Sequence, residues 1–226
     1  MLSDTRKKDG RSATKSREVI LDAAERAFAE FGYEGAAIRA IARDAGVNQA
    51  MIHYYFQNKE QLFSDAIARR AGEINARRNA ELDQLFADGV PTLEELMASL
   101  LRPTIEFGHD ESRGGSAYSR LVVLFSHSTD ERSKRMAMDN YDPIARRSIA
   151  AIRTVVPDLD EASAVRGYLY SISIALSVMT RTGRAARLSE GLCDEFDTEE
   201  TIRSTVAFTC AGIRALAGDV ARGNSA

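Results

Sequence analysis

The stretch that decides the fold is IRAIARDAGVNQAMIHYYF, from Ile38 to Phe56. Apolar residues at helical spacing in its first half predict a short helix, and Gly46 is placed to adopt the left-handed conformation that ends helices. Asn48 is a suitable N-cap for a second helix, in which Ile52 and Phe56 lie four residues apart and face inward. Two short helices joined by one tight turn form a helix-turn-helix.

The second helix of this motif leaves a mixed polar and aromatic face exposed. A helix this short has little stability of its own, so we interpret the exposed face as a binding surface. Its width and chemistry fit the major groove of DNA. The residues that point outward are Gln49, Ala50, Met51, His53 and Tyr54.

Composition limits the class of protein. The chain has 226 residues, of which 44% are hydrophobic, and this suits one large domain or two small ones with a substantial core. It contains no apolar run of about 18 residues and no secretory signal, so we expect a cytoplasmic protein that does not contact a membrane. The two cysteines, Cys193 and Cys210, are too isolated for a disulfide framework or a zinc site, and we expect no metal.

The N-terminal segment is basic, although the net charge of the whole chain is -3. We predict that residues 1–14 form a disordered arm, which either lies along DNA phosphates or is simply a solvated terminus. Six basic side chains precede the first predicted helix or lie in its first turn: Arg6, Lys7, Lys8, Arg11, Lys15 and Arg17.

The chain shows helical periodicity and no strand-like alternation, so the predicted fold class is all-α. The first helix runs from Ser16 to Phe31, and its pair Phe28 and Phe31 should form the floor beneath the helix-turn-helix. A later helix, capped by Asn58, is about 28 residues long, which is enough to bridge two domains. Pro103 should kink or divide the helix that contains it.

Arginine is abundant in the middle of the long helix. We interpret Arg69, Arg70, Arg77 and Arg78 mainly as a solvated face. The last two predicted helices, 162–182 and 198–216, are unusually apolar and carry small residues that permit close helix contact. We predict that they form a four-helix dimer interface, and the alternative is packing within one subunit.

The segment from Ser16 to Phe63 closely resembles the DNA-binding domain of the TetR family of transcriptional regulators. The resemblance rests on the helix with its paired phenylalanines, on IRAIARDAGV, on a tyrosine-rich recognition helix ending in YYF, and on NKEQLF, all at the family's spacing. In that family a three-helix N-terminal domain is joined by a long fourth helix to an all-helical ligand-binding and dimerisation domain. The resemblance therefore implies a homodimer that binds a palindromic operator on double-stranded DNA.

The periodicity and the resemblance together divide the chain into four regions. We expect the helix-turn-helix itself at about 37–56. The regions are a basic arm over 1–14, a DNA-binding domain over 15–62, a helical ligand-binding and dimerisation domain over 63–218, and a disordered tail over 219–226.

The resemblance also assigns DNA contacts to individual residues. Arg39 matches a position that often touches DNA, and Lys59 matches the lysine that grips phosphate from the next helix. Many relatives have threonine where Ala37 stands, so the contact made by that hydroxyl is not expected here. The base-facing positions are Gln49, Ala50, Met51 and His53, and the backbone-facing positions are Tyr54 and Tyr55.

The C-terminal half is faintly similar to a subgroup of the family that senses fatty acids or their acyl derivatives. A buried apolar cavity needs aromatic walls and a few polar anchors, which gives a set of candidate ligand-binding residues. The alternative for each of them is an ordinary place in the core. The candidates are Phe107, Tyr118, Phe125, His127, Tyr168 and Met179, whereas His109 should be exposed in a polar loop.

The leading hypothesis is a homodimeric repressor that a small hydrophobic or amphipathic effector releases from its operator, with the long helix as the lever. A transcriptional activator of the same fold and a small-molecule-binding protein without DNA binding are the alternatives. The sequence argues against an enzyme and gives no reason to expect a cofactor. It holds three histidines with no paired metal-ligand spacing, no glycine-rich phosphate loop and no GxSxG motif.

Overall fold

The structure is a computed structural model that describes residues 3–223. In that part of the chain it contains eleven α-helices, one short 3-10 helix and no strand, which confirms the predicted all-α class. None of these helices combines the length and the apolar character needed to cross a bilayer. The elements are α1 Ser3–Gly35, α2 Ile38–Asp44, α3 Gln49–Phe56, α4 Lys59–Ala87, α5 Leu93–His109, η1 Glu111–Arg113, α6 Gly115–Ser126, α7 Glu131–Asn140, α8 Asp142–Val155, α9 Glu161–Val178, α10 Arg184–Leu188 and α11 Thr198–Gly223.

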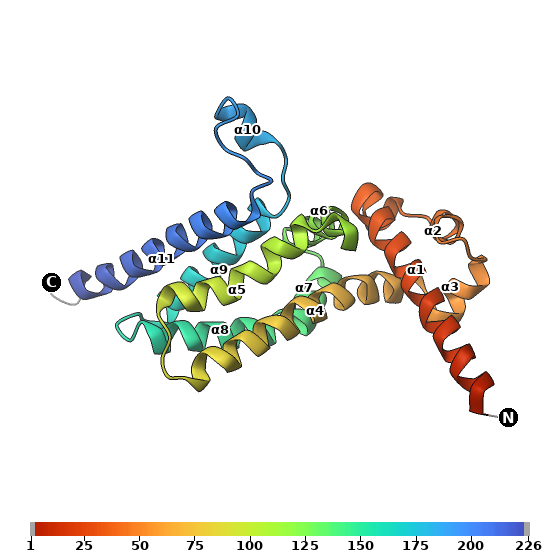
Figure 1. Cartoon of the computed structure of the whole chain (residues 1–226), viewed down its shortest axis with the longest axis horizontal. Coiled ribbons are helices and arrows are strands. Elements are labelled where there is room, and N and C mark those ends of the chain that lie inside the picture. The colour runs from red at the N-terminus through yellow and green to blue at the C-terminus, as the bar shows by residue number, and fades with distance from the viewer. Residues whose placement is uncertain (1–2, 224–226) are drawn as a thin grey trace.

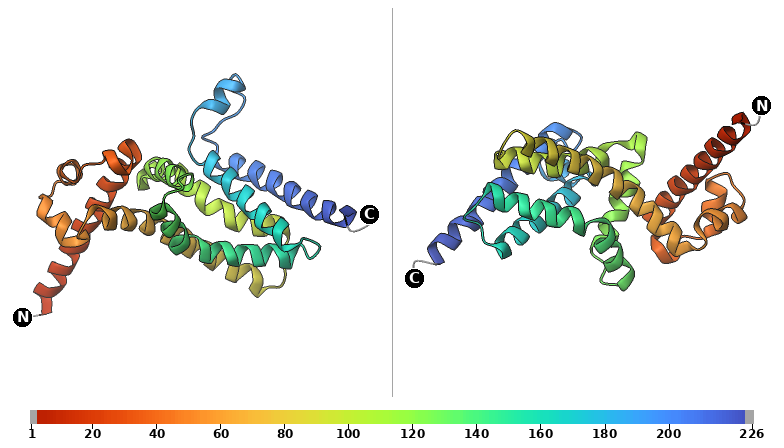
Figure 2. Two further views of the ribbon diagram at one scale, coloured as in Figure 1. Left: turned by 180° about the vertical axis from the view of Figure 1, so that it is seen from behind. Right: turned by 90° about the horizontal axis from the view of Figure 1, so that it is seen from below.

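The molecule is elongated, with α1, α2 and α3 at one end and a helical bundle at the other (Figure 1). Helix α4 runs from the first end into the bundle, which is formed with α5, α8, α9 and α11. The short helix α10 sits on an excursion between α9 and α11 that projects from the body (Figures 1 and 2). The long fourth helix therefore connects the two ends.

Helix α1 is longer than the sequence predicted. We expected a disordered arm over 1–14 and a helix from Ser16, whereas α1 already begins at Ser3. No proline interrupts this polar stretch, so the helix continues through it. At the other end of the chain, α11 extends to Gly223 into the expected disordered tail, and residues 224–226 lie outside the described part.

The break at the end of α1 occurs where it was predicted. Gly32 has φ 68° and ψ 177°, a conformation that interrupts the helix and favours glycine. Phe28 is fully buried, but Phe31 is 56% exposed, so the expected floor of two phenylalanines is wrong in its second member. The turn at Gly32 instead brings Tyr33 against Phe28 and Phe63, with ring centroids 6.1 Å and 5.1 Å away.

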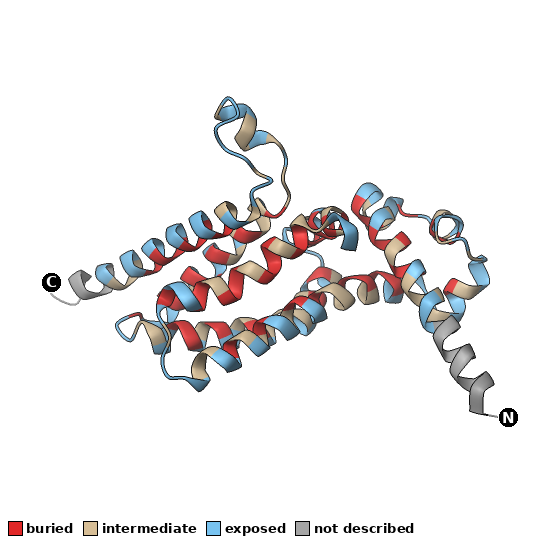
Figure 3. Ribbon diagram, in the orientation of Figure 1, coloured by how far each residue is buried: buried red, intermediate tan, exposed pale blue. Residues whose placement is uncertain are grey.

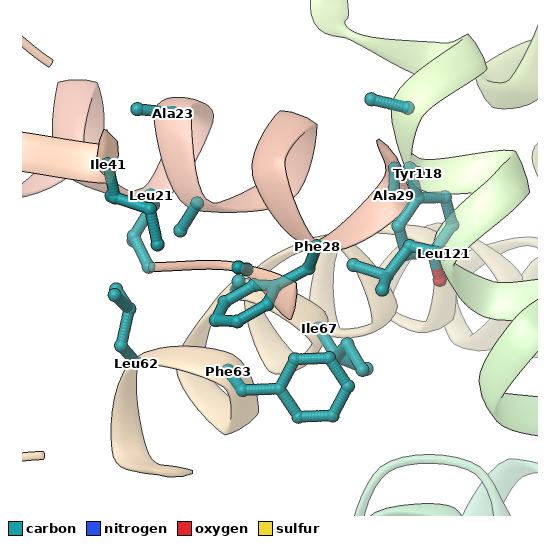
Figure 4. Close-up of a cluster of buried hydrophobic side chains, with 14 of the residues drawn as sticks. Leu21, Ala23, Phe28, Ala29, Ile41, Leu62, Phe63, Ile67, Tyr118 and Leu121 are labelled. Atoms are coloured by element: carbon teal, nitrogen blue, oxygen red, sulfur yellow. The ribbon is translucent and has the colours of Figure 1, made fainter. Parts of the chain in front are cut away.

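Two hydrophobic clusters fill the interior. The first joins α1, α2, α3 and the start of α4 to α6, whose Tyr118 and Leu121 lie beside the end of α1 (Figure 4). The second joins α5, α8, α9 and α11. Helix α4 contributes residues up to Ile74 to the first cluster and Leu82 to the second. Buried residues occur at both ends of the molecule, on the sides where helices face one another (Figure 3). The end that holds α1, α2 and α3 thus shares its core with part of the bundle and does not pack alone.

Pro103 lies inside α5, which continues from Leu93 to His109, so of the two expected outcomes, a kink or a division, the division does not occur. Proline lacks an N–H, which weakens the turn before it. The buried side chain of Arg78 reaches this turn from α4, where its Nε donates to the Leu100 carbonyl at 2.8 Å and its Nη2 donates to the Thr104 hydroxyl at 2.5 Å. These bonds give the weakened turn extra polar contacts.

Candidate nucleic-acid interface and buried core site

The turn between α2 and α3 is fixed by backbone and side-chain bonds. Gly46 has φ +66°, as its predicted role at a helix end requires. The Val47 amide donates to the Ala42 carbonyl at 3.0 Å, which closes the end of α2. The Asn48 side chain accepts a hydrogen bond from the Met51 amide at 2.9 Å, which confirms it as the N-cap of α3.

Helix α3 divides into a buried and an exposed side. Ile52 and Phe56 are 1% and 0% exposed, so they anchor the helix to the first cluster as predicted. Tyr54, by contrast, is 80% exposed. Of the other predicted DNA contacts on this helix, Gln49, Ala50 and His53 are exposed, whereas Met51 and Tyr55 are half-buried.

The exposed side of α3 is polar and partly ordered by its own contacts. The Gln49 amide nitrogen lies 3.5 Å from Nε2 of His53, and Nδ1 of that histidine lies 3.3 Å from the Gln57 carbonyl. Tyr54 meets Tyr55 edge-to-face at 5.1 Å between ring centroids. These contacts hold donors, acceptors and aromatic edges on one convex surface, which is the arrangement that readout of base edges needs.

The two basic residues expected to touch DNA differ in their surroundings. Arg39 is exposed in the first turn of α2, and no ion pair involves it in the described part of the chain. Lys59 donates from Nζ to the Glu34 carbonyl at 3.1 Å, and its Nζ lies 4.8 Å from the centre of the Tyr33 ring. Lys59 therefore braces the domain as well as lying near the proposed surface.

Helix α7 also contacts Tyr33, a role that sequence reasoning missed. The guanidinium of Arg132 stacks on this ring with Cζ 3.6 Å from its centre, and Arg135 pairs with Glu60 at 3.3 Å. No local pattern could have revealed these contacts, because they depend on where α7 packs. Tyr33 thus links the helix-turn-helix domain to the bundle through two cations, Lys59 and Arg132.

An ion cluster joins α1 to α4. Glu25 is 2% exposed and accepts from Arg69 at 2.6 Å and from Arg70 at 3.0 Å, and both arginines also bond to Asp22. Burial raises the pKa of the Glu25 carboxyl above its ordinary value, although the two guanidinium groups lower it. Our interpretation of Arg69 and Arg70 as a solvated face is wrong because α1 covers them.

Four of the predicted ligand-binding residues belong to one cluster, namely Phe107, Tyr118, Phe125 and Met179. The Phe107 and Tyr118 rings meet edge-to-face at 5.2 Å. The Tyr118 hydroxyl lies 2.9 Å from the Tyr141 hydroxyl, and the Tyr141 ring stacks on Phe125 at 5.8 Å. These contacts bring α5, α6 and the end of α7 together around one aromatic group.

The other two predicted ligand-binding residues lie elsewhere. Tyr168 belongs to the second cluster. His127 is exposed after the end of α6, where its Nδ1 lies 2.9 Å from the Val123 carbonyl, so its expected place in a pocket is wrong. His109 is likewise not in an exposed loop, since it ends α5 half-buried with Nδ1 2.9 Å from the Thr198 hydroxyl.

Two hollows lie near these elements. A cavity of about 160 Å³ separates α6 and α7 from the end of α1, and Tyr33, Phe125 and Arg132 are among its lining residues. An almost wholly apolar groove of about 260 Å³ runs between α9 and α11, lined in part by Tyr170 and Phe208. Of the six predicted ligand-binding residues, Phe125 alone lines either hollow.

Comparison with protein families gives two matches along the chain. Residues 20–66 match the model described as bacterial regulatory proteins, tetR family. Residues 98–212, about half of the chain, match the model described as tetracyclin repressor-like, C-terminal domain. Both ends of the molecule therefore match models of one kind of regulator.

Curated relatives agree with the family matches. The HTH-type transcriptional repressor AcnR of Corynebacterium glutamicum is 42% identical over 73 residues, which are 32% of this chain and 36% of that protein. The chain thus matches about a third of the length of AcnR. The HTH-type transcriptional repressor Rv1474c of Mycobacterium tuberculosis is 29% identical over 152 residues, which are 62% of this chain and 71% of that protein.

A solved structure resembles the fold over most of its length. It is the transcriptional regulator FadR from Bacillus subtilis in complex with stearoyl-CoA. The TM-score is 0.61 at 16% identity, with 84% of this chain and 97% of that chain covered. At this identity the likeness concerns the fold alone.

Proposed function

The chain belongs to the TetR family of transcriptional regulators, and from this premise we propose that it is a homodimeric repressor released from its operator by a small effector. The observation that carries this proposal is the exposed side of α3, which Ile52 and Phe56 hold away from the core. A dimer presents two such helices to successive major grooves of a palindromic site.

The division of labour follows the predicted regions. Residues 15–62 read DNA through Arg39 on α2 and through the predicted residues of α3. Residues 63–218 bind the effector and the second subunit. Helix α4, with the Glu25, Arg69 and Arg70 cluster at its DNA-binding end, supports a mechanism in which the two ends move as linked bodies.

Dimerisation is proposed to occur through α9 and α11. Support comes from the apolar groove between these helices and from the exposed side chains of Leu169, Tyr170 and Phe208, which are 54%, 59% and 69% exposed. Apolar side chains gathered on one face of two neighbouring helices fit a four-helix interface. Phe208→Glu should give monomers in sedimentation experiments, whereas Leu188→Glu on the projecting excursion serves as the control.

The effector is proposed to be hydrophobic or amphipathic and to bind within the bundle. The aromatic group around Tyr118 supports this, as does the fold shared with a regulator whose structure holds stearoyl-CoA. Differential affinity of the effector for two arrangements of the dimer would then weaken DNA binding.

A mobility-shift titration with the intergenic DNA beside the protein's own gene tests the proposal. The expected result is a saturable shift that a mixture of cell-extracted apolar compounds reverses. Binding of apolar compounds without any DNA shift would instead favour a small-molecule-binding protein. Expression of a reporter that falls on deletion of the gene would identify an activator.

A further inference from the structure

Arg78 is a buried cation at the middle of α4. It lies between the part of α4 that belongs to the first hydrophobic cluster, up to Ile74, and the part that belongs to the second, at Leu82. The residue is 4% exposed. A guanidinium stays charged in proteins, so its burial is costly unless a negative group lies nearby.

The partners of Arg78 are all neutral. Its Nε, Nη1 and Nη2 donate to the Leu100 carbonyl at 2.8 Å, to Asn75 Oδ1 at 3.3 Å and to the Thr104 hydroxyl at 2.5 Å. These bonds use three of the five N–H groups of a guanidinium. In the described chain Arg78 forms no salt bridge. The carboxylate of Glu81, three residues further along α4, pairs with Arg77 at 2.7 Å.

Other arginines of α4 have carboxylate partners. Arg69 and Arg70 are also largely buried, and each pairs with at least two carboxylates. Arg77 pairs with Glu106 as well as with Glu81. The absence of a counter-charge at Arg78 is therefore a local property and does not reflect a general shortage of acidic residues.

Two tyrosines lie beside the residues that Arg78 contacts and add donors. The Tyr118 ring meets Phe107, which follows Thr104 by one turn of α5, and the Asn75 side chain that accepts from Arg78 donates to the Asn140 carbonyl beside Tyr141. Tyr118 is 2% exposed, and Tyr141 is half-buried. The hydroxyls of Tyr118 and Tyr141 bond to each other at 2.9 Å, so one of the two protons is left without an acceptor from the partner ring. Burial raises the pKa of both hydroxyls, while the positive charge of Arg78 lowers it.

We propose that Arg78, Tyr118 and Tyr141 form the head-group site for an anionic amphiphile, whose carboxylate or phosphate oxygens accept from these donors. The group has more hydrogen-bond donors than acceptors and carries a net positive charge in a nearly dry environment. An anionic oxygen would accept hydrogen bonds from the surplus donors and would neutralise the positive charge. The apolar aromatic group of Phe107, Tyr118 and Phe125 provides surroundings suited to the hydrocarbon chain.

The head-group site is connected to the DNA-binding end by contacts through Tyr141 and α7. An effect of ligand binding on that end rests on the proposed function. Tyr141 directly follows α7, where its backbone departs from helical geometry at φ −123° and ψ −30°. An oxygen that enters between Tyr118 and Tyr141 displaces the second ring and with it the end of α7. The same helix contacts the helix-turn-helix domain through Arg132 on Tyr33, so binding at Arg78 alters the support of that domain.

Calorimetric titration of the full-length protein with three matched probes tests the site. The probes are dodecanoate, dodecyl phosphate and dodecanol, each kept below its aggregation concentration. We expect at least one anionic probe to bind about tenfold or more tightly than dodecanol, and the better anion identifies the head group. Equal affinity for all three probes, or binding of none, overturns the head-group site.

Two variants separate ligand binding from folding. Arg78→Gln removes the charge and should reduce the anion's advantage over dodecanol about tenfold, and Tyr118→Phe removes one donor and should reduce it several-fold. Arg147→Gln, at an exposed position, should leave it unchanged. If Arg78→Gln fails to fold, Tyr118→Phe and Tyr141→Phe carry the test. A purely structural Arg78 would lower the melting temperature but keep the anion's advantage in the tyrosine variants.

Fluorescence anisotropy with labelled operator DNA separates this inference from the proposed function. Anion binding with no effect on a DNA complex contradicts the route through Tyr141 while the head-group site stands. Failure to bind any DNA contradicts the proposed repressor and leaves the calorimetric result intact. Release of DNA by dodecanol and by both anions at equal concentrations contradicts a role for Arg78 in the response.

Discussion

The DNA-binding end and the bundle each contain an arginine without a salt bridge in the described chain, but one is exposed and the other is buried. Arg39 is exposed on α2, where water can solvate its charge. Arg78 is buried in the bundle, where its hydrogen-bond partners in the described chain are neutral. An exposed cation is an ordinary part of a surface that binds DNA, whereas a buried one is a specific, costly feature that needs its own explanation.

The junction between the two ends shows a third arrangement. Glu25 on α1 lies between Arg69 and Arg70 of α4, so buried positive charges are matched there by buried negative charge. Substitutions at the exposed surface, at the buried Arg78 and at the junction should therefore change different properties of the protein, and by different amounts. Substitution at the junction should mainly affect stability, and substitution at the exposed surface should mainly affect DNA binding.

The largest expected effect is at the junction. Glu25→Gln leaves two largely buried guanidinium groups short of a carboxylate, and removal of one partner of a buried ion pair costs about 3–5 kcal/mol. We therefore expect the free energy of unfolding, measured with urea, to fall by about that amount. Glu30→Gln on the exposed side of α1 is the control. A loss of less than about 1 kcal/mol at Glu25 would show that α1 and α4 are not held by this cluster.

The next effect concerns the exposed surface. Gln49→Ala should weaken binding to the specific operator by about 1–3 kcal/mol and relax the preference at one base pair. The unfolding free energy should hardly change, because the side chain is exposed. Competition assays with operator variants measure both quantities, with Gln84→Ala on α4 as the control. An unaltered base preference would remove Gln49 from the readout surface.

Substitution of Lys59 should affect both the stability of the fold and the binding of DNA. Lys59→Ala removes the bond to the Glu34 carbonyl and the contact with the Tyr33 ring, so we expect a stability loss of about 1 kcal/mol. It should also reduce the slope of log affinity against log salt by about one if Nζ reaches a phosphate. An unchanged slope together with reduced stability would assign Lys59 to the support of the domain alone.

The smallest expected effect is a pH dependence inside the bundle. Burial lowers the pKa of His109, with a further contribution from Arg181, so the folded state prefers the neutral ring. The stability that this provides is fully present above the ordinary pKa of histidine, about 6.5, and is lost as pH falls through the lowered value. His109→Gln should flatten this part of the stability curve by less than about 1 kcal/mol, because the ring is half exposed. His127→Gln should not flatten it.

The helix-turn-helix could be predicted because its determinants are local. The cap at Asn48, the left-handed turn at Gly46 and the inward pair Ile52 and Phe56 each depend on a few neighbouring residues. The burial of Phe31 was predicted wrongly because helical spacing alone does not locate the turn that brings Tyr33 inward. A short-range pattern therefore describes this end of the chain well.

The bundle was harder to predict because its functional contacts join distant segments. The surroundings of Arg78 come from α5, from Tyr118 on α6 and from Tyr141 at the end of α7, and periodicity places none of these beside it. Arg69 and Arg70 look like solvated residues until α1 covers them. The contacts that Arg78 makes with the turn of α5 around Pro103 likewise lie outside the local sequence.

The central claim is that a pair of α3 helices binds adjacent major grooves, and footprinting on the intergenic DNA beside the gene tests it most directly. We predict two protected half-sites about one helical turn apart, centred on a palindrome, with loss of protection when Tyr54 and Gln49 are both changed to alanine. Protection that survives this double substitution, or a single unpaired protected site, would contradict the claim.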